Sequence, residues 1–114
     1  MIVPSPLSPD FIPDLRQALP IPEKGIVSRV LRNDERLKVV LYGLAAGHAM
    51  SPHAAPFPAM LYFVEGEAIL TLGEETMPVG MGAFTQMPAN LKHAIVANTP
   101  VLMLLVIVKA ATPE

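Results

Sequence analysis

Apolar residues are grouped along the chain in short runs, separated by glycine, proline and polar turn residues. The first clear runs are Ile26–Leu31 and Leu37–Leu44, with the charged segment 32–36 between them. Short apolar or alternating runs that are bounded by turn residues predict β-strands. Further strands are predicted at Met60–Val64, Glu67–Leu72, Thr76–Val79, Ala83–Met87, His93–Ala97 and Val101–Lys109. Many short, closely spaced strands indicate an all-β fold, either a sandwich or a barrel.

The first 25 residues have a different pattern, because proline recurs through them at short intervals. We predict an extended, proline-rich N-terminal arm over residues 1–25 and a single barrel domain over residues 26–114. Within the arm, Pro13–Leu19 is expected to form one or two helical turns with proline at the start, where its missing N–H costs nothing. A free tail would gain nothing from apolar side chains, so we expect them to lie on the barrel or on a partner subunit: Ile2, Val3, Phe11, Ile12 and Leu15.

Composition narrows the class of protein further. The 13 prolines disfavour long helices, and 52% hydrophobic residues are enough to fill a core. A net charge of −2 without a basic block gives no support to nucleic-acid or anionic-membrane binding. No cysteine is present, which excludes disulfides, thiolate nucleophiles and cysteine zinc sites. No run approaches the roughly 20 apolar residues of a membrane helix, and no signal-peptide pattern is visible, so a cytoplasmic location is expected.

Two histidine-containing stretches carry a resemblance to a known family. In the first, five residues separate Gly47 from His53, and the stretch ends at Gly66 within Phe63-Val64-Glu65-Gly66-Glu67. In the second, Gly82 is followed by Pro88-Ala89-Asn90 and then by His93, with Asn98 beyond it. These stretches resemble the two conserved motifs of the cupin superfamily. The resemblance implies a cupin-type jelly-roll β-barrel, and cupins commonly form homodimers.

The resemblance also implies a set of metal ligands, which this chain retains only in part. The ligand set implied by the resemblance is two histidines and a glutamate from the first motif and one histidine from the second. His53 matches the first of these positions and His93 the last, whereas Ala55 and Ala59 stand at the other two. Methyl groups cannot coordinate a cation. The resemblance therefore implies a divalent transition metal as a possible cofactor, bound at a site that keeps only two of the four ligands. His48 is a candidate replacement ligand.

Strand alternation predicts the walls of a pocket around the two histidines. If Ala59 faces inward, Leu61 and Phe63 also do, and an inward His93 brings Ile95 inward. Gln86 is a candidate hydrogen-bonding residue, but alternation leaves open whether Phe84 and Gln86 or Thr85 and Met87 face the interior. The predicted pocket residues are His53, His93, Gln86, Ala55, Ala59, Leu61, Phe63 and Ile95. Met60, Tyr62 and Val64 then form an apolar outer face, which fits a homodimer.

Two functions from different classes are compatible with these residues. The first is a binding module that holds a small organic ligand by His53 and His93 in an otherwise apolar pocket. The alternative is a metal-dependent enzyme of the dioxygenase or isomerase type that uses the reduced site. No catalytic residue is assigned, and a role without any small ligand is a third interpretation. The acidic residues of the arm and turns, including Asp10 and Asp34, are interpreted as solvated.

Overall fold

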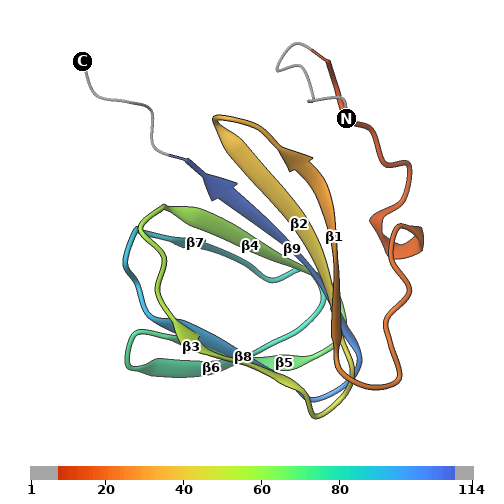
Figure 1. The fold of residues 1–114 in the computed structure, drawn as a ribbon. Coiled ribbons are helices and arrows are strands. Elements are labelled where there is room, and N and C mark those ends of the chain that lie inside the picture. Colours follow the sequence, from red (N-terminus) through yellow and green to blue (C-terminus); the bar gives the residue numbers. More distant parts are fainter. Residues whose placement is uncertain (1–7, 110–114) are drawn as a thin grey trace.

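The computed structural model describes residues 8–109 of the chain, which form a two-layered β-structure. Over this range a short 3-10 helix is followed by nine strands: η1 (Leu15–Gln17), β1 (Ile26–Asn33), β2 (Leu37–Leu44), β3 (Ala49–His53), β4 (Ala59–Glu65), β5 (Ala68–Leu72), β6 (Glu75–Val79), β7 (Phe84–Met87), β8 (His93–Ala97) and β9 (Val101–Val108). One sheet has the order β1-β2-β9-β4-β7 and the other β3-β8-β5-β6. The two sheets face each other (Figure 1), and the predicted all-β jelly-roll barrel is confirmed.

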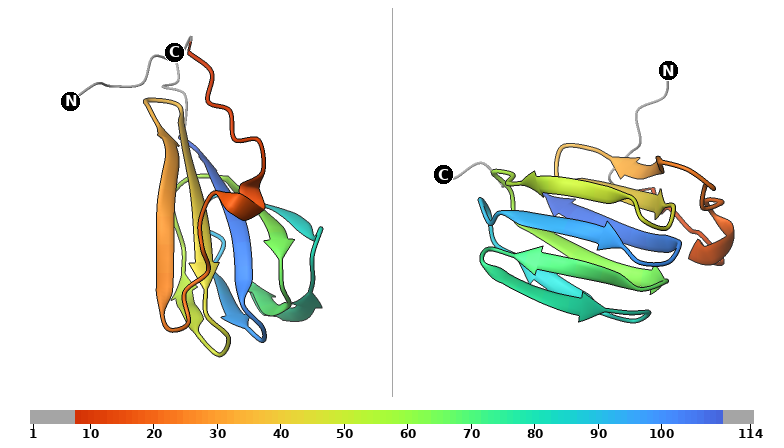
Figure 2. Two further views of the ribbon diagram at one scale, coloured as in Figure 1. Left: turned by 90° about the vertical axis from the view of Figure 1, so that its right-hand side faces the viewer. Right: turned by 90° about the horizontal axis from the view of Figure 1, so that it is seen from below.

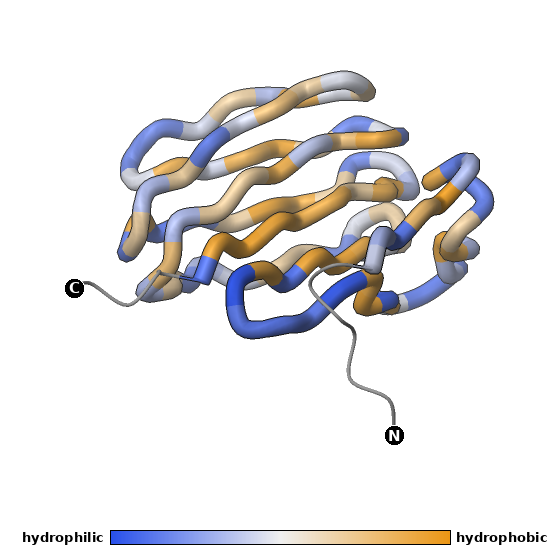
Figure 3. Tube along the Cα trace, turned by 90° about the horizontal axis from the view of Figure 1, so that it is seen from above, coloured by the Kyte–Doolittle hydropathy of each residue, from blue (hydrophilic) through white to orange (hydrophobic). Residues whose placement is uncertain are grey.

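The main core lies between the two sheets and follows strand alternation. Leu61 and Phe63 on β4 are each 1% exposed, and Ile95 on β8 is 2% exposed, so the inward positions are those that parity predicts. The hydropathy of the chain follows the same division, with apolar segments along the strands and hydrophilic ones at many of the turns (Figure 3). Apolar burial of this kind is the main favourable contribution to folding.

One strand, β3, was not predicted from the sequence. It contains Pro52, and a proline inside a short polar segment argues against a central strand. β3 lies at the edge of the four-stranded sheet and pairs only with β8, where its register shifts between Met50 and His53. An edge position with a register shift accommodates a residue that lacks a backbone N–H.

The N-terminal arm crosses the outer face of the five-stranded sheet (Figure 2). There it covers a second apolar cluster, in which Leu41, Val64 and Leu102 are buried. The arm and neighbouring strands contribute partly buried residues to this cluster: Leu15, Ala18, Leu19, Ile21, Leu31 and Leu104. The guanidinium of Arg29 also donates a hydrogen bond of 2.8 Å to the Ala18 carbonyl. The arm therefore packs on its own barrel.

The apolar residues of the arm have different surroundings. Leu15 packs in the cluster, whereas Phe11 is 81% exposed. Ile2 and Val3 lie outside the described residues. Val64 points outward as predicted, but it is only 9% exposed because the arm covers it, while Tyr62 on the same strand is 38% exposed. The open part of the outer face is thus limited to the side of the sheet that the arm does not reach.

The two stretches that carry the family resemblance place residues in the left-handed backbone region. Gly66 has a φ of 91° at the turn between β4 and β5, and Asn90 has a φ of 69° before β8. Asparagine is among the few non-glycine residues that adopt this region readily, so it can take the place of the glycine in the second motif. This turn leads directly into His93.

Candidate functional site

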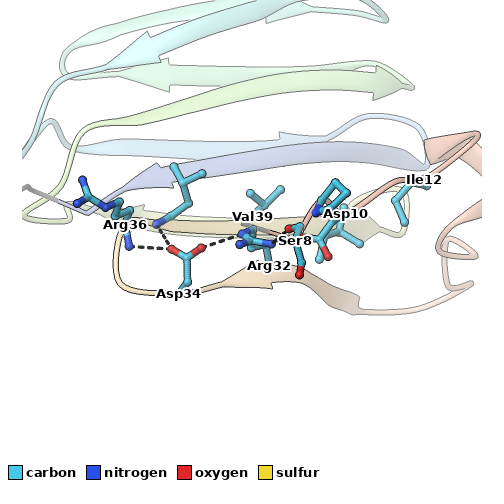
Figure 4. Close-up of a pocket in the computed structure, with 10 residues that line it drawn as sticks. Ser8, Asp10, Ile12, Arg32, Asp34, Arg36 and Val39 are labelled. Carbon is cyan, nitrogen blue, oxygen red and sulfur yellow. Dashed lines mark hydrogen bonds and ion pairs between the residues drawn. The ribbon is translucent and has the colours of Figure 1, made fainter. Parts of the chain in front are cut away.

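One cavity of the described residues is lined by none of the residues predicted for the histidine site. It is a groove of about 450 Å³ between residues 8–12 of the arm and the β1–β2 hairpin (Figure 4). Arg32 joins its two sides, because Nη1 donates to Asp10 Oδ2 at 2.6 Å and Nε donates to Asp34 Oδ2 at 2.7 Å. Arg32, Asp10 and Asp34 are thus paired with one another in this groove. We interpret it as the seam that holds the arm to the barrel.

Asp34 has a structural role in this seam, which corrects its interpretation as a solvated turn residue. Its Oδ1 accepts backbone hydrogen bonds from Arg36 at 2.7 Å and from Leu37 at 2.9 Å. These N–H groups, together with the Arg32 guanidinium, lower the pKa of the Asp34 carboxyl from its ordinary 3.8 to about 2. Its side chain is 10% exposed, so this carboxylate is a largely buried hydrogen-bond acceptor at the turn of the β1–β2 hairpin.

His53 and His93 lie side by side at one end of the other sheet. They are directly paired in the register of β3 and β8, and their ring centroids are 4.3 Å apart with an interplanar angle of 57°. His93 is 9% exposed, whereas His53 is exposed at the edge of the sheet. The structure therefore brings together the two histidines that sequence spacing singled out.

Each imidazole ring is oriented by a hydrogen bond to the backbone carbonyl two residues before it. His53 Nδ1 donates to the Ser51 carbonyl at 3.0 Å, and His93 Nδ1 donates to the Leu91 carbonyl at 3.0 Å. A carbonyl oxygen only accepts, so each Nδ1 carries the proton, and in a neutral ring Nε2 has the lone pair. The nitrogen left to a ligand is therefore Nε2 in both residues.

A small cavity of about 50 Å³ opens beside the two rings. Apart from the two histidines its lining is apolar and comes from the five-stranded sheet and from loops: Ala55, Phe57, Ala59, Met87, Pro88, Leu91, Leu105 and Ile107. This volume holds a head group of a few atoms rather than a whole drug-sized molecule, for which pockets measure about 300–1,000 Å³. The rest of a ligand would lie at the mouth, against the partly exposed Phe57 and Leu91.

Several predicted pocket residues lie elsewhere. Leu61, Phe63 and Ile95 face the interior but are packed in the core and do not line the cavity. Gln86 is exposed on the outer face of β7, and Met87 takes the inward position. This corrects the assignment of Gln86: the register pairs Met87 with the inward Ala59, so the alternate residue must face out.

His48 is also separated from the site. It precedes β3, and its carbonyl accepts from the N–H of Ala97, at the opposite end of β8 from His93. Ala97 is four strand residues from His93, so His48 lies about 13 Å from His93. His48 Nε2 instead accepts a hydrogen bond of 3.1 Å from the backbone N–H of Gly25, where the arm enters β1. Its assignment as a replacement metal ligand is corrected accordingly.

The residues at the cavity do not fit a cupin metal centre of the full ligand set. The cavity lining offers two imidazole nitrogens and no carboxylate, and Ala55 and Ala59 present methyl groups where the family has ligands. Within residues 8–109 no group of three or more histidine, cysteine, aspartate or glutamate side chains is placed to hold a metal ion. A site with only two protein ligands holds a transition metal weakly.

Comparisons with known proteins agree with the fold. The family model of the cupin domain matches residues 40–108. No curated protein matches the sequence. Among solved structures, the conserved SPY1581 protein of unknown function from Streptococcus pyogenes is 30% identical, with 98% of each chain covered and a TM-score of 0.84. A cupin superfamily protein from Desulfitobacterium hafniense, DSY2733, is 19% identical over 95% of each chain, with a TM-score of 0.80.

A third solved structure matches a smaller part of the chain. KdgF from a Halomonas species is 21% identical to this chain, with a TM-score of 0.72, and the match covers 76% of this chain and 82% of KdgF. At this identity the likeness concerns the fold alone. Across the part of the chain that the structure describes, no helix has the length and apolarity needed to cross a bilayer.

Proposed function

Because the chain belongs to the cupin family, we propose that it is a small-molecule-binding barrel in which His53 and His93 hold the polar end of an organic ligand. The observation that carries the proposal is the pairing of two oriented imidazoles with an apolar cavity. A few converging polar groups in apolar walls are typical of small-molecule sites. In the larger groove Arg32 is paired with Asp10 and Asp34, whereas His53 and His93 line the small cavity with both Nδ1 atoms already bonded and Nε2 left for a ligand.

The alanines at positions 55 and 59 support a binding role over a metal-dependent reaction. Side chains that would coordinate an ion are replaced by methyl groups, and these also leave room beside the rings. A ligand that enters this space removes apolar surface from water, which contributes about 25 cal/mol per Å². The histidines then determine the orientation of the ligand more than its total binding energy.

A fragment screen by thermal shift tests this proposal. A ligand at about 100 times its Kd stabilises the folded state by about 2.7 kcal/mol, which raises Tm by roughly 10–20 °C in a domain of this size. We expect His53→Ala to abolish the shift, because this exposed side chain forms one wall of the cavity. The matched control is His48→Ala, which removes a histidine about 13 Å away and is expected to leave the shift unchanged.

Two results would contradict the proposal. One is a broad library of small phenols, acids and amides in which no compound raises Tm. The other is a divalent transition metal retained at one equivalent through gel filtration by wild type and lost in His53→Ala. That second result would favour the alternative of a metal-dependent enzyme.

We also propose that a second copy of the chain covers the open part of the outer face. Two rows of paired residues lie there, one with Val106, Met60 and Gln86 and the other with Tyr62 and Phe84. Neither row contains a charged side chain, and Phe84 is 61% exposed. An uncharged apolar face can pack against its own copy without burying an unpaired charge.

The oligomeric state tests this second proposal directly. We expect wild type to have the mass of a dimer in light scattering after gel filtration, and Phe84→Lys to have the mass of a monomer. The control Phe11→Lys changes an even more exposed aromatic residue, which lies on the arm, and is expected to remain dimeric. A monomeric wild type at all concentrations would refute the proposal.

A further inference from the structure

The two imidazoles at the cavity offer a ligand hydrogen-bond acceptors. Both Nδ1 atoms already donate to backbone carbonyls, of Ser51 and Leu91, so the two Nε2 atoms of the neutral rings are acceptors. Among residues 8–109, neither Nε2 has a hydrogen-bond partner. The backbone N–H groups of Asn90 and Leu91, next to the cavity, are used by the carbonyls of Ala55 and Pro88. The two imidazoles therefore offer hydrogen-bond acceptors at Nε2, and their Nδ1 protons are already used.

No other side chain of the cavity changes this balance. The eight remaining lining residues are alanine, phenylalanine, methionine, proline, leucine and isoleucine, which have neither a strong donor nor a charge. A ligand that only accepts, such as a carboxylate, would direct its lone pairs at those of the imidazoles. An ammonium group would donate, but the apolar walls would leave its charge poorly solvated. The head group that fits is neutral and brings its own proton.

We propose that the ligand ends in a neutral hydroxyl on an aromatic ring, that is, a phenol, which donates its proton to an Nε2 of the pair. This inference rests on the binding function proposed above and specifies its ligand class. A phenolic hydroxyl has a pKa near 10 and remains protonated at neutral pH, unlike a carboxylic acid. The cavity of about 50 Å³ takes the hydroxyl and its adjoining carbons, and Phe57, Pro88 and Leu91 contact the ring at the mouth.

Phenol, anisole and benzoate form a probe set that separates donor chemistry from shape. Anisole is phenol with the hydroxyl proton replaced by methyl, and benzoate has an acceptor-only head group. Each is titrated into the ¹⁵N-labelled full chain at pH 8, where free imidazole is neutral, and amide shifts are followed by NMR. We expect phenol to bind at least tenfold more tightly than anisole and benzoate, with the shifts centred on residues around His53 and His93.

Variants connect the preference to the pair. His53→Phe keeps a flat ring at the rim but removes its acceptor nitrogen, and it is expected to reduce the ratio of phenol to anisole affinity toward one. His48→Phe is the matched control and is expected to retain the ratio. If anisole binds wild type as tightly as phenol, or benzoate binds more tightly, the inferred ligand class is wrong while the binding function stands. If none of the three binds, the ligand class is again wrong, and a blank fragment screen then refutes the binding function as well.

Discussion

Gly66 is the position where a single methyl group is expected to do the most harm to the barrel. It lies at the turn between β4 and β5, which ends the first family-like stretch, and its φ of 91° is one that side chains rarely adopt. A Cβ built at this residue would be 2.1 Å from the Pro100 carbonyl oxygen and 2.9 Å from Val101 Cα. Both neighbours are backbone atoms at the start of β9, so neither can move aside as a flexible side chain would.

The cost of Gly66→Ala has two separable parts. The left-handed backbone costs an alanine roughly 1–2 kcal/mol, and forcing a methyl group into a packed space costs typically about 1–3 kcal/mol more. We therefore expect a loss of roughly 2–5 kcal/mol in the free energy of unfolding. Domains of this kind are stable by about 5–15 kcal/mol, so the variant should still fold and remain measurable.

Two other glycines provide the controls. Gly47 has a φ of 82° with nothing within 4 Å of its built Cβ, so Gly47→Ala carries the backbone cost alone, roughly 1–2 kcal/mol. Gly80 has open space and no left-handed φ, so Gly80→Ala should lie within about 0.5 kcal/mol of wild type.

Urea denaturation followed by circular dichroism measures all three variants on one scale. The expected order of stability is wild type and Gly80→Ala, then Gly47→Ala, then Gly66→Ala. If Gly66→Ala equals Gly47→Ala, the steric argument is wrong, because the β4–β5 turn must then relax freely from β9. If Gly80→Ala loses as much as Gly47→Ala, the backbone argument is wrong.

Two further predictions concern the seam between arm and barrel. Arg32→Gln removes the charge that both Asp10 and Asp34 contact, so limited proteolysis should cleave the arm earlier than in wild type; an unchanged cleavage rate would show that the apolar contacts of the arm suffice. The folded-state pKa of Asp34 is depressed to about 2, so its stabilisation is present above pH 4 and is lost as pH falls from about 4 to 2. Urea unfolding across that range should show a smaller acid-induced loss in Asp34→Asn than in wild type, and parallel pH curves would contradict the assignment.

The sequence predicts the interior of the barrel better than its rim. The inward positions of Leu61, Phe63 and Ile95 follow from the two-residue period of a strand, which holds wherever the strand lies. Gln86 and Met87 could not be assigned in this way, because β7 has apolar residues on both faces. The outer face is apolar partly because the arm packs on it, and that is a tertiary fact absent from the local pattern.

For the candidate site, too, the sequence predicted one part and could not predict another. Family-like spacing predicted that His53 and His93 share one site, and the register of β3 and β8 pairs them directly. The sequence could not show that each Nδ1 bonds a carbonyl two residues earlier, because ring orientation depends on rotamers and local backbone. β3 itself was missed, since tolerance of Pro52 depends on the strand lying at the edge of its sheet.

The position of β9 has a consequence for how the chain folds during synthesis. β9 comes last among the strands of residues 8–109, yet it lies between β2 and β4 at the centre of the five-stranded sheet. A nascent chain that has not reached Val101 has no strand to join these two, and its β2 and β4 edges are unpaired. The ribosome must therefore release the chain through β9 before the barrel can close, and until then the exposed edges are open to chaperones or to aggregation.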